Sequence, residues 1–362
     1  SSYTATAIAS GVSTGATSAS SPVTITGLTN GTSYSVTGLA NNAFGASPYS
    51  AATSITVGNP DITQQIALFF GGSSGSGGIN QIDQRNLAST GNASDFGDMS
   101  TGAYYVAAAG NTTRAVYNLG QTLAPLYAVN TLEYVTFASA GNGADFGDLT
   151  TVRQGATCAS NHTRGLYGSG EDASGATNRI DFVAINSLGN SSDFGDLTVA
   201  KNNRASCSSP TRGIWAGGTA ATVNVIDFVT TASEGNASDF GDLLATNYGF
   251  GGVSNSTRGV FGGGYGSGSP YSNVIQYITM ASEGNATDFG DLTQARYLNT
   301  SASGQTIGVF AGGIAASSTY VNTIDQVTIA STANATDFGD LVTARGYFAG
   351  SSGCSSSHGG LQ

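Results

Sequence analysis

The tetrapeptide Asp-Phe-Gly-Asp occurs six times in this chain of 362 residues, and it constrains the fold more than any other feature. Successive copies begin 46 to 50 residues apart, which is a nearly constant period. Such a period indicates a repeated unit whose hydrophobic faces become buried only against neighbouring units. The copies are Asp95–Asp98, Asp145–Asp148, Asp193–Asp196, Asp239–Asp242, Asp288–Asp291 and Asp337–Asp340.

Each repeat divides into four short segments rich in Val, Ile, Thr and aromatic residues and separated by Gly and Asn, a pattern typical of β-strands. Examples are Arg258–Gly264, which ends in glycines, Asn224–Ser233, which is β-branched, and Arg204–Ser208, which has mainly small residues. Four strands in a unit of this length predict the blades of a six-bladed β-propeller. We align the central aromatic of the glycine-ended strand as Phe70, Tyr117, Tyr167, Trp215, Phe261 and Phe310.

The phase of the repeats predicts how the ring closes. The first repeat begins at the glycine-ended strand, Ile66–Gly72, and so lacks an innermost strand, whereas Gly346–Ser352 remains as a spare strand at the end. We expect these two segments to pair, because closure removes the unpaired sheet edges that promote aggregation. The predicted fold is therefore all-β, with a six-bladed propeller over residues 64–362 closed by its C-terminal strand.

The order of the segments resembles that of kelch-type propellers, in which a small-residue inner strand precedes a hydrophobic strand ending in Gly-Gly. The chain departs from kelch repeats in its Asp-Phe-Gly-Asp element, whose Phe stands where kelch repeats have an outer aromatic. Segments such as Thr257–Gly264, Asn224–Thr230 and Asn285–Arg296 also resemble repeat proteins encoded by tailed phages, notably phages of marine cyanobacteria. This resemblance implies an extracellular location in a virion.

The N-terminal residues 1–58 lack the repeat. Leu28–Tyr34 matches the L-x-x-G-x-x-Y pattern of a tyrosine corner, and strands are expected at Val23–Thr26, Ser33–Leu39 and Ala52–Val57. The pattern looks like the C-terminal part of a fibronectin type III-like β-sandwich, so we expect further sequence upstream. Residues 59–63 read as a linker between this domain and the propeller.

Composition limits the partners of the chain. The formal net charge is −11 and there are only 11 Lys and Arg residues, which are dispersed along the sequence. Nucleic acid binding needs clustered basic residues that neutralise phosphates, so we expect no nucleic acid partner. No apolar run approaches the ~20 residues that span a bilayer, so we expect no membrane insertion.

The repeated acidic pairs suggest acid–base catalysis or calcium binding, but both interpretations have weak support. Six equivalent pairs do not make one catalytic cleft, and each repeat offers few ligands for calcium. We interpret the pairs as turn-stabilising residues, with Asn and the first Asp bonding to backbone and Phe packing between blades. No triad, phosphate loop or Cys/His metal motif is recognisable, so we expect no enzymatic activity, no metal and no cofactor.

A second set of residues recurs with the repeat. Arg114, Arg164, Arg212 and Arg258 are expected to pair with a repeat acid or to stack on an aromatic of the next blade, rather than to bind anions. The cysteines Cys158 and Cys207 are expected to be small buried thiols near the propeller axis.

The loops that follow the glycine-ended strands vary in length and sequence, and in a propeller they gather on one face. Tyrosines in these loops, beside Ser, Gly and Asn, suit recognition of saccharide or protein. The candidate ligand-binding residues are Tyr127, Tyr265, Tyr271 and Tyr320.

The resulting functional hypothesis is a non-enzymatic virion surface protein, a tail-fibre or adhesin-like component whose propeller binds a host surface glycan or protein. Its other partners would be virion proteins, and it would occur as a homo-oligomer or in multiple copies. One alternative is a decoration protein of capsid or tail without a host ligand, and a further one is a propeller enzyme acting on polysaccharide.

Overall fold

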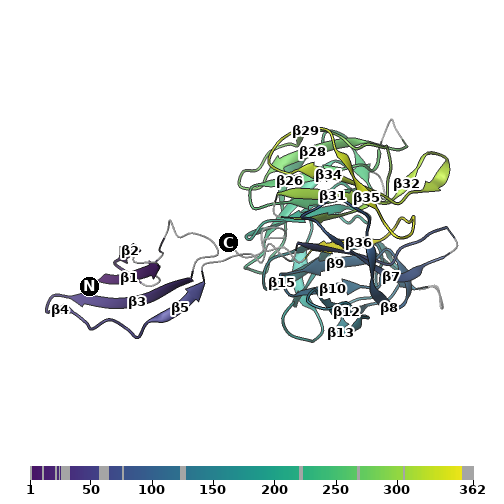
Figure 1. Cartoon of the computed structure of the whole chain (residues 1–362). Helices are drawn as coiled ribbons and strands as arrows, with labels where there is room; N and C mark the ends of the chain where they lie inside the picture. The colour runs from purple at the N-terminus through teal and green to yellow at the C-terminus, as the bar shows by residue number, and fades with distance from the viewer. Residues whose placement is uncertain are drawn as a thin grey trace. The chain divides into compact units, whose positions relative to one another are not determined.

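The chain is organised entirely around β-strands, and the predicted all-β class is confirmed (Figure 1). In the computed structural model the only other regular element among the described residues is a short 3-10 turn, η2 (Ala316–Ser318). The chain divides into two compact units, Ser1–Ile62 and Thr63–Gln362. The described residues are 2–9, 12–20, 23, 25, 33–56, 65–75, 77–122, 128–219, 223–266, 270–304 and 306–352.

The N-terminal unit contains one antiparallel sheet in its described residues, rather than the two facing sheets of a sandwich. Its long central strand pairs with one neighbour on one side and with two short strands on the other. Of the predicted segment Val23–Thr26, the described residues 23 and 25 are not in a strand, and residues 26–32 of the expected tyrosine corner and linker residues 59–63 lie outside the described residues. The strands are β1 (Ser2–Ala9), β2 (Val12–Ser18), β3 (Ser33–Asn42), β4 (Gly45–Ala46) and β5 (Thr53–Thr56).

In the described residues of the second unit there are six larger antiparallel sheets, each built on four strands, and three small two-stranded ones. In five of them the four strands follow one another in the chain, so each sheet is one meander. They are β9 (Ala107–Gly110), β10 (Arg114–Asn118), β12 (Thr131–Thr136), β13 (Ala144–Asp148); β14 (Thr157–Ser160), β15 (Arg164–Gly168), β18 (Arg179–Ala184), β19 (Ser192–Asp196); β20 (Ala205–Ser208), β21 (Arg212–Ala216), β22 (Val225–Thr230), β23 (Ser238–Asp242); β25 (Gly251–Ser254), β26 (Arg258–Gly262), β28 (Val274–Thr279), β29 (Thr287–Asp291); and β30 (Thr300–Ser303), β31 (Ile307–Ala311), β34 (Thr323–Thr328), β35 (Thr336–Asp340).

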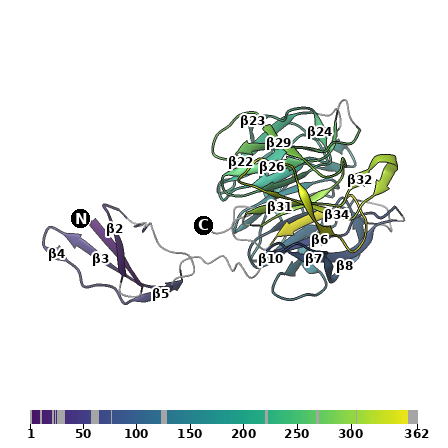
Figure 2. The same cartoon turned by 45° about the horizontal axis from the view of Figure 1, so that its top comes forward.

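The remaining sheet joins the two ends of the repeat region. Strands β6 (Ile66–Phe70), β7 (Ile79–Asn86) and β8 (Ser94–Tyr104) pair in order, β11 (Gln121–Thr122) extends them, and β36 (Ala349–Ser352) pairs with β6. The C-terminal strand, yellow in Figures 1 and 2, therefore lies beside a strand from the start of the repeats, as predicted for Gly346–Ser352.

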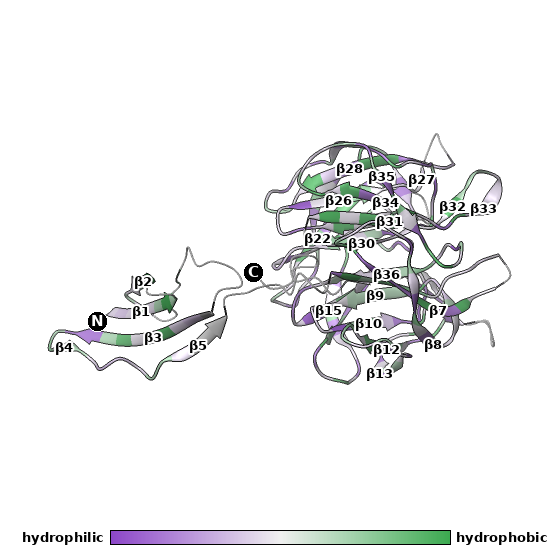
Figure 3. Cartoon of the chain, in the orientation of Figure 1, coloured by the Kyte–Doolittle hydropathy of each residue, from purple (hydrophilic) through white to green (hydrophobic). Residues whose placement is uncertain are grey.

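The first strand of each sheet, which we call the inner strand, contacts the inner strands of the neighbouring repeats. Contacts run from β9 through β14, β20, β25 and β30 to β36, and from β36 back to β9. Hydrophobic side chains of the second and third strands fill the space between the sheets, and Figure 3 shows hydrophobic residues along strands such as β31. Packing between sheets, rather than within one, therefore forms the core.

The strand register corrects one detail of the sequence alignment. Tyr167 lies opposite Asp181 and Trp215 opposite Asp227, and in the first sheet it is Phe69 that lies opposite Asp83. The central aromatic of that repeat is therefore Phe69, not Phe70. The sequence offered two adjacent phenylalanines, and only the pairing distinguishes them.

Candidate binding site

Two kinds of loop meet at the same end of each sheet, because the second strand runs antiparallel to the inner strand. The loop after the second strand and the segment leading into the inner strand are joined there by backbone pairing. The pairs are Tyr104 with Gln121, Gln154 with Glu171, Tyr248 with Tyr265, Tyr297 with Ile314 and Gly346 with Ser73, and in the remaining sheet Thr219 N–H donates to the Asn202 carbonyl over 3.0 Å.

Immediately before each inner strand the backbone adopts the left-handed conformation, with φ between 52° and 65°. Backbone N–H groups at these positions donate to the carbonyl of the equivalent residue in the preceding repeat in five of the six steps, over 2.5 to 3.2 Å. Four of these residues are not glycine, and a left-handed φ costs such residues ~1–2 kcal/mol each. Strain of this kind is common at ligand-binding sites. The six residues, here called the left-handed ring, are Tyr105, Gly155, Asn203, Gly249, Leu298 and Tyr347.

A cavity of about 110 Å³ is lined by the left-handed ring and the inner strands of all six sheets. Beyond the cavity, buried serine hydroxyls connect neighbouring inner strands. Ser160 Oγ donates to the Gly110 carbonyl over 2.9 Å, and Ser254 Oγ donates to the Ser208 carbonyl over 2.7 Å. These bonds draw the inner strands together at that end, so the left-handed ring forms the mouth of the cavity.

Tyrosines crowd around this mouth. The rings of Tyr105 and Tyr347 lie edge to face, with 4.8 Å between their centroids. Tyr104 packs on Tyr105, and Tyr248 packs on Tyr297. All five side chains are half-buried.

The structure brings together three of the four tyrosines predicted from the sequence. Tyr265 and Tyr271 both contact Tyr297, at 5.5 and 5.6 Å between ring centroids. The Tyr320 hydroxyl lies 3.5 Å from Ser73 Oγ, and Tyr320 influences the ionisation of Tyr347. Tyr127 lies outside the described residues. We call the resulting group the tyrosine face: Tyr104, Tyr105, Tyr248, Tyr265, Tyr271, Tyr297, Tyr320 and Tyr347.

Five members of the tyrosine face were missed by sequence reasoning, which considered only the variable loops. Tyr104, Tyr248 and Tyr297 occupy equivalent positions one residue before the left-handed ring, and Tyr105 and Tyr347 belong to the ring itself. Aligning the segments after each Asp-Phe-Gly-Asp would have shown this enrichment. The enrichment in tyrosine could be linked to a binding site only once the structure showed that these segments meet the variable loops.

Three hydroxyls of the tyrosine face, those of Tyr105, Tyr297 and Tyr347, have raised pKa values. Burial raises the pKa of Tyr297 and Tyr347, and neighbouring tyrosines raise both further. Burial likewise raises the pKa of Tyr105. The face therefore presents neutral hydroxyls and aromatic rings at ordinary pH.

The opposite part of the mouth is polar. Gln154 and Asn202 stand one residue before the ring, and Asn202 Nδ2 donates to Glu171 Oε2 over 2.5 Å. A mouth with aromatic rings on one side and amide and carboxylate groups on the other can stack against a ligand and hydrogen-bond to it.

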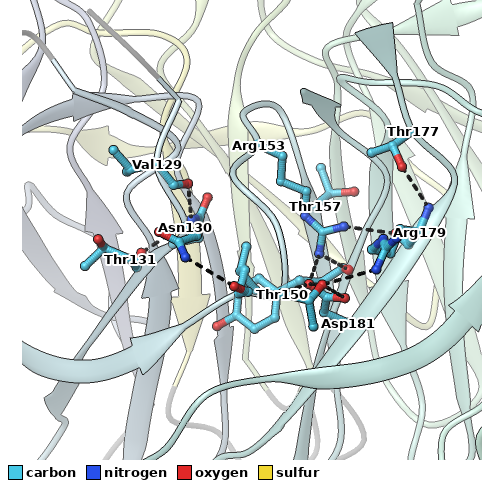
Figure 4. Close-up of polar contacts among 12 residues, drawn as sticks. Val129, Asn130, Thr131, Thr150, Arg153, Thr157, Thr177, Arg179 and Asp181 are labelled. Carbon is cyan, nitrogen blue, oxygen red and sulfur yellow. Dashed lines mark hydrogen bonds and ion pairs between the residues drawn. The ribbon is translucent and has the colours of Figure 1, made fainter. Parts of the chain in front are cut away.

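Four buried ion pairs hold neighbouring repeats together below this face. In Figure 4, Arg153 approaches Asp181, with 3.1 Å between Nη2 and Oδ2, and both side chains are fully buried. The Thr150 hydroxyl also donates to Asp181, and Arg153 donates to the Tyr167 carbonyl. Arg153 lies in the segment that leads from one sheet into β14, and Asp181 belongs to the sheet of β14, so each pair ties a connecting segment to the sheet that it enters. The others are Arg204–Asp227, Arg296–Asp325 and Arg345–Asp83.

In the two remaining sheets, hydrogen bonds to Glu133 and Gln276 take the place of the ion pair. Glu133 is buried without an arginine and accepts from the Tyr117 hydroxyl over 2.8 Å and from Ser100 N–H over 3.2 Å. Gln276 accepts from Leu244 N–H over 2.8 Å. These exceptions show that a polar acceptor is kept at this position whether or not a cation faces it.

The arginines singled out in the sequence do stack, but on an aromatic of their own sheet. The Arg114 guanidinium lies 4.3 Å from the Tyr134 ring centroid and that of Arg258 lies 4.3 Å from Tyr277. Each also donates to a carbonyl of the next repeat, as Arg114 does to Ile185 over 3.2 Å. Only Arg212 pairs with an acid, Glu283, at 3.6 Å on the surface. They therefore bridge repeats.

The Asp-Phe-Gly-Asp turns link neighbouring sheets rather than capping their own turn. Asn142 Oδ1 accepts from the N–H of Asp98 in the preceding repeat over 3.0 Å. The same bond occurs six times, and Asn92 makes it to Asp340 across the chain ends over 3.1 Å. The Phe side chains, such as Phe240, are buried. The expected burial of the Phe is confirmed, whereas the Asn bonds to the preceding repeat and not within its own turn.

Among the described residues, Cys158 and Cys207 are free and buried, and Cys158 lines the cavity. No three His, Cys, Asp or Glu side chains in the described part of the chain gather as metal ligands. The described segments also contain no helix long and apolar enough to cross a membrane.

No protein-family model matches the chain, and no curated protein matches its sequence.

Proposed function

We propose that the six sheets form a closed, six-bladed, kelch-like β-propeller over residues 64–362. Three observations support closure: the inner strands contact one another in cyclic order, β36 pairs with β6, and Asn92 bonds to Asp340 as the other five asparagines bond to their neighbours. In a closed ring every inner strand has a neighbour on each side, so the ring of inner strands has no exposed end.

The propeller acts as a non-enzymatic binding head that recognises a host-surface glycan through the tyrosine face. The observation that carries this function is the clustering of tyrosines from several repeats around the mouth of the cavity, on strained backbone. Aromatic rings stack on the apolar faces of sugars, and tyrosine hydroxyls and nearby amides bond to sugar hydroxyls. Half-buried tyrosines lose little conformational entropy on binding, because neighbouring rings already position them.

The biological setting follows from the resemblance to repeat proteins of tailed phages. The chain would be a tail-fibre or adhesin-like component of a virion, with other virion proteins as partners. The N-terminal unit would be a fibronectin type III-like spacer. Multiple copies would convert weak individual sites into strong attachment.

A binding experiment with the purified chain tests this function. The probes are a glycan array and envelope polysaccharide from marine cyanobacteria. The variant Tyr271→Ala/Tyr320→Ala should weaken binding by about tenfold or more, since each ~1.4 kcal/mol lost is a factor of ten. Tyr49→Ala is the matched control, because Tyr49 is an exposed tyrosine of the N-terminal unit.

Two results would contradict the proposal. If neither probe binds and the chain instead occupies a large interface within the particle, it is a decoration protein. If polysaccharide is shortened during incubation, the chain is an enzyme.

A further inference from the structure

The tyrosines at the cavity mouth belong to consecutive repeats. Four neighbouring positions of the left-handed ring either are tyrosines or directly follow one, and backbone hydrogen bonds join these positions in order. Leu298 N–H donates to the Gly249 carbonyl over 2.5 Å, and Tyr347 N–H donates to the Leu298 carbonyl over 3.2 Å. Tyr105 N–H donates to the Tyr347 carbonyl over 2.8 Å. We call the tyrosines at these positions the tyrosine arc: Tyr248, Tyr297, Tyr347, Tyr105 and Tyr104.

The spacing of the tyrosine arc suits a chain of sugar rings. Backbones joined by a direct hydrogen bond lie ~5 Å apart, which is close to the length of one sugar residue in an extended chain. The ring centroids are spaced similarly, with 4.8 Å between Tyr105 and Tyr347 and 6.4 Å between Tyr248 and Tyr297. A ligand that follows the arc therefore meets a new aromatic ring with each successive residue.

The aromatic surface covers only part of the mouth. The two remaining positions of the left-handed ring are Gly155 and Asn203, and they follow Gln154 and Asn202 instead of tyrosines. Asn202 Nδ2 donates to Glu171 Oε2, so this part of the mouth is polar. A compact ligand centred on the mouth would face the polar repeats as much as the aromatic ones. An elongated ligand can instead lie on the four aromatic repeats alone.

The charges at the mouth favour an uncharged ligand. The tyrosine arc contains no charged side chain. Arg204 is the charged residue of the cavity lining, and its fully buried guanidinium is paired with Asp227 at 2.6 Å. An acidic polymer would therefore find no free cation in the lining to compensate for the water that its carboxylates lose. Aromatic rings and neutral hydroxyls suit the apolar faces and the hydroxyl groups of neutral sugars.

We propose that the tyrosine arc binds an internal segment of a linear, uncharged, β-linked polysaccharide, with successive sugar rings stacked on the tyrosines of successive repeats. This inference rests on the proposed function and specifies the form of its ligand. In β-1,4-linked glucose chains the hydroxyl groups point outward from the ring edges, so both faces of each ring are covered by C–H groups that can stack on tyrosine. The arc tyrosines are half-buried, and thus open to solvent along the arc, so binding does not require a chain end.

The length of an oligosaccharide tests the inference. The probes are the cello-oligosaccharides from cellobiose to cellohexaose, which are uncharged and β-1,4-linked, and calorimetry with the full chain measures their affinities. We expect affinity to rise about threefold or more with each added residue as far as cellotetraose, because each residue gains one aromatic ring, and to level off beyond it.

Substitutions at the two ends of the arc link the length dependence to this site. Tyr104→Ala and Tyr248→Ala each remove one end, so each should lower the affinity for cellohexaose by about threefold to tenfold. Cellobiose should bind almost as before, because it can occupy the remaining rings. Tyr49→Ala, at an exposed tyrosine of the N-terminal unit, is the matched control. Thermal unfolding shows which variants are folded, and the length series on the unaltered chain stands if neither is.

The outcomes separate the two proposals. Equal affinity from cellobiose to cellohexaose would overturn the extended arc and leave the tyrosine face as a compact glycan site. Folded end variants that weaken cellobiose and cellohexaose by the same factor would lead to the same conclusion. If envelope polysaccharide binds and no cello-oligosaccharide does, the uncharged β-linked class is wrong.

Two further results would overturn both proposals. One is the absence of binding to any glycan. The other is binding to envelope material that proteinase treatment abolishes and periodate oxidation of the sugars does not, because the ligand would then be a protein.

Discussion

Arg345 and Asp83 come from opposite ends of the repeat region, yet Arg345 Nη2 lies 3.3 Å from Asp83 Oδ2 and both side chains are fully buried. Arg345 also donates to the Phe69 carbonyl over 3.0 Å, and Asp83 accepts from Val342 N–H over 3.1 Å. The same contacts link consecutive repeats elsewhere, as between Arg296 and Asp325. The chain ends are therefore joined by the same polar contact that joins neighbouring repeats.

The first prediction concerns this pair. Arg345→Met or Asp83→Leu alone should lower the free energy of unfolding by about 3–5 kcal/mol, because each leaves a buried charge without its partner. The double variant should lose much less of the free energy of unfolding. Burial raises the pKa of Asp83 more than Arg345 lowers it, so desolvation already offsets much of the attraction between the two charges. Urea unfolding measures all three.

The surface pair Arg212–Glu283 serves as the control, because its side chains are 23 % and 54 % exposed. Glu283→Gln should change stability by at most ~1 kcal/mol. The explanation would be wrong if the double variant were as unstable as either single variant. The loss would then come from losing the ion pair and not from leaving one buried charge without its partner.

The second prediction concerns the glycine of Asp-Phe-Gly-Asp. At Gly147, φ is 144° and a Cβ would lie 2.5 Å from the Gly189 carbonyl oxygen of the next repeat. Gly189 has a similar φ of 151° but nothing within 4 Å of its would-be Cβ. Gly189→Ala should therefore cost only the backbone strain of ~1–3 kcal/mol, and Gly147→Ala should cost clearly more in chemical denaturation. Equal losses would refute the close-approach explanation.

The third prediction contrasts two acidic residues in equivalent positions. Asp181→Asn should destabilise the fold by about 3–5 kcal/mol, because Arg153 would be left buried and unpaired. Glu133→Gln should be neutral or stabilising, because no arginine faces Glu133 and an amide can accept from Tyr117 and donate to Ser100. Gln276 already occupies this position in another repeat. Thermal unfolding at neutral pH measures the difference, and a loss at Glu133→Gln as large as at Asp181→Asn would contradict it.

The fourth prediction is a dependence on alkaline pH. Burial raises the pKa of Tyr105, Tyr297 and Tyr347, so the folded protein keeps protons that unfolded tyrosines lose near pH ~10. The unfolded state then binds fewer protons, so stability is complete below pH ~10 and falls as the pH rises above it. Urea midpoints across this range should decline less steeply for Tyr347→Phe than for the unaltered chain. Parallel curves would show that this hydroxyl does not resist ionisation.

The periodic features of the fold could be predicted from the sequence because they depend on local chemistry. The spacing of Asp-Phe-Gly-Asp, the β-branched segments and the spare strand at Gly346–Ser352 gave the all-β class and the pairing of β36 with β6. The choice between Phe69 and Phe70 could not be made, since adjacent aromatics point to opposite faces and only the register selects one.

Three of the eight members of the tyrosine face could also be predicted, because Tyr265, Tyr271 and Tyr320 lie in loops that vary between repeats. Tyr297 and Tyr347 could not, because they belong to connecting segments whose neighbours are set by how one sheet packs on the next. The buried ion pairs follow the same rule. Arg204 follows the left-handed residue of its repeat, whereas Arg153, Arg296 and Arg345 precede theirs, and all four reach an equivalent aspartate.

The sequence by itself determined the repeating unit, its four strands and the surface on which its loops vary, because strand formation and turns depend on residues close together in the chain. The tertiary structure alone decided which side chains meet at the cavity mouth and which charges pair between repeats. Those contacts join residues about half a repeat to one repeat apart or near opposite ends of the repeat region, so they depend on the packing of whole sheets rather than on any local pattern.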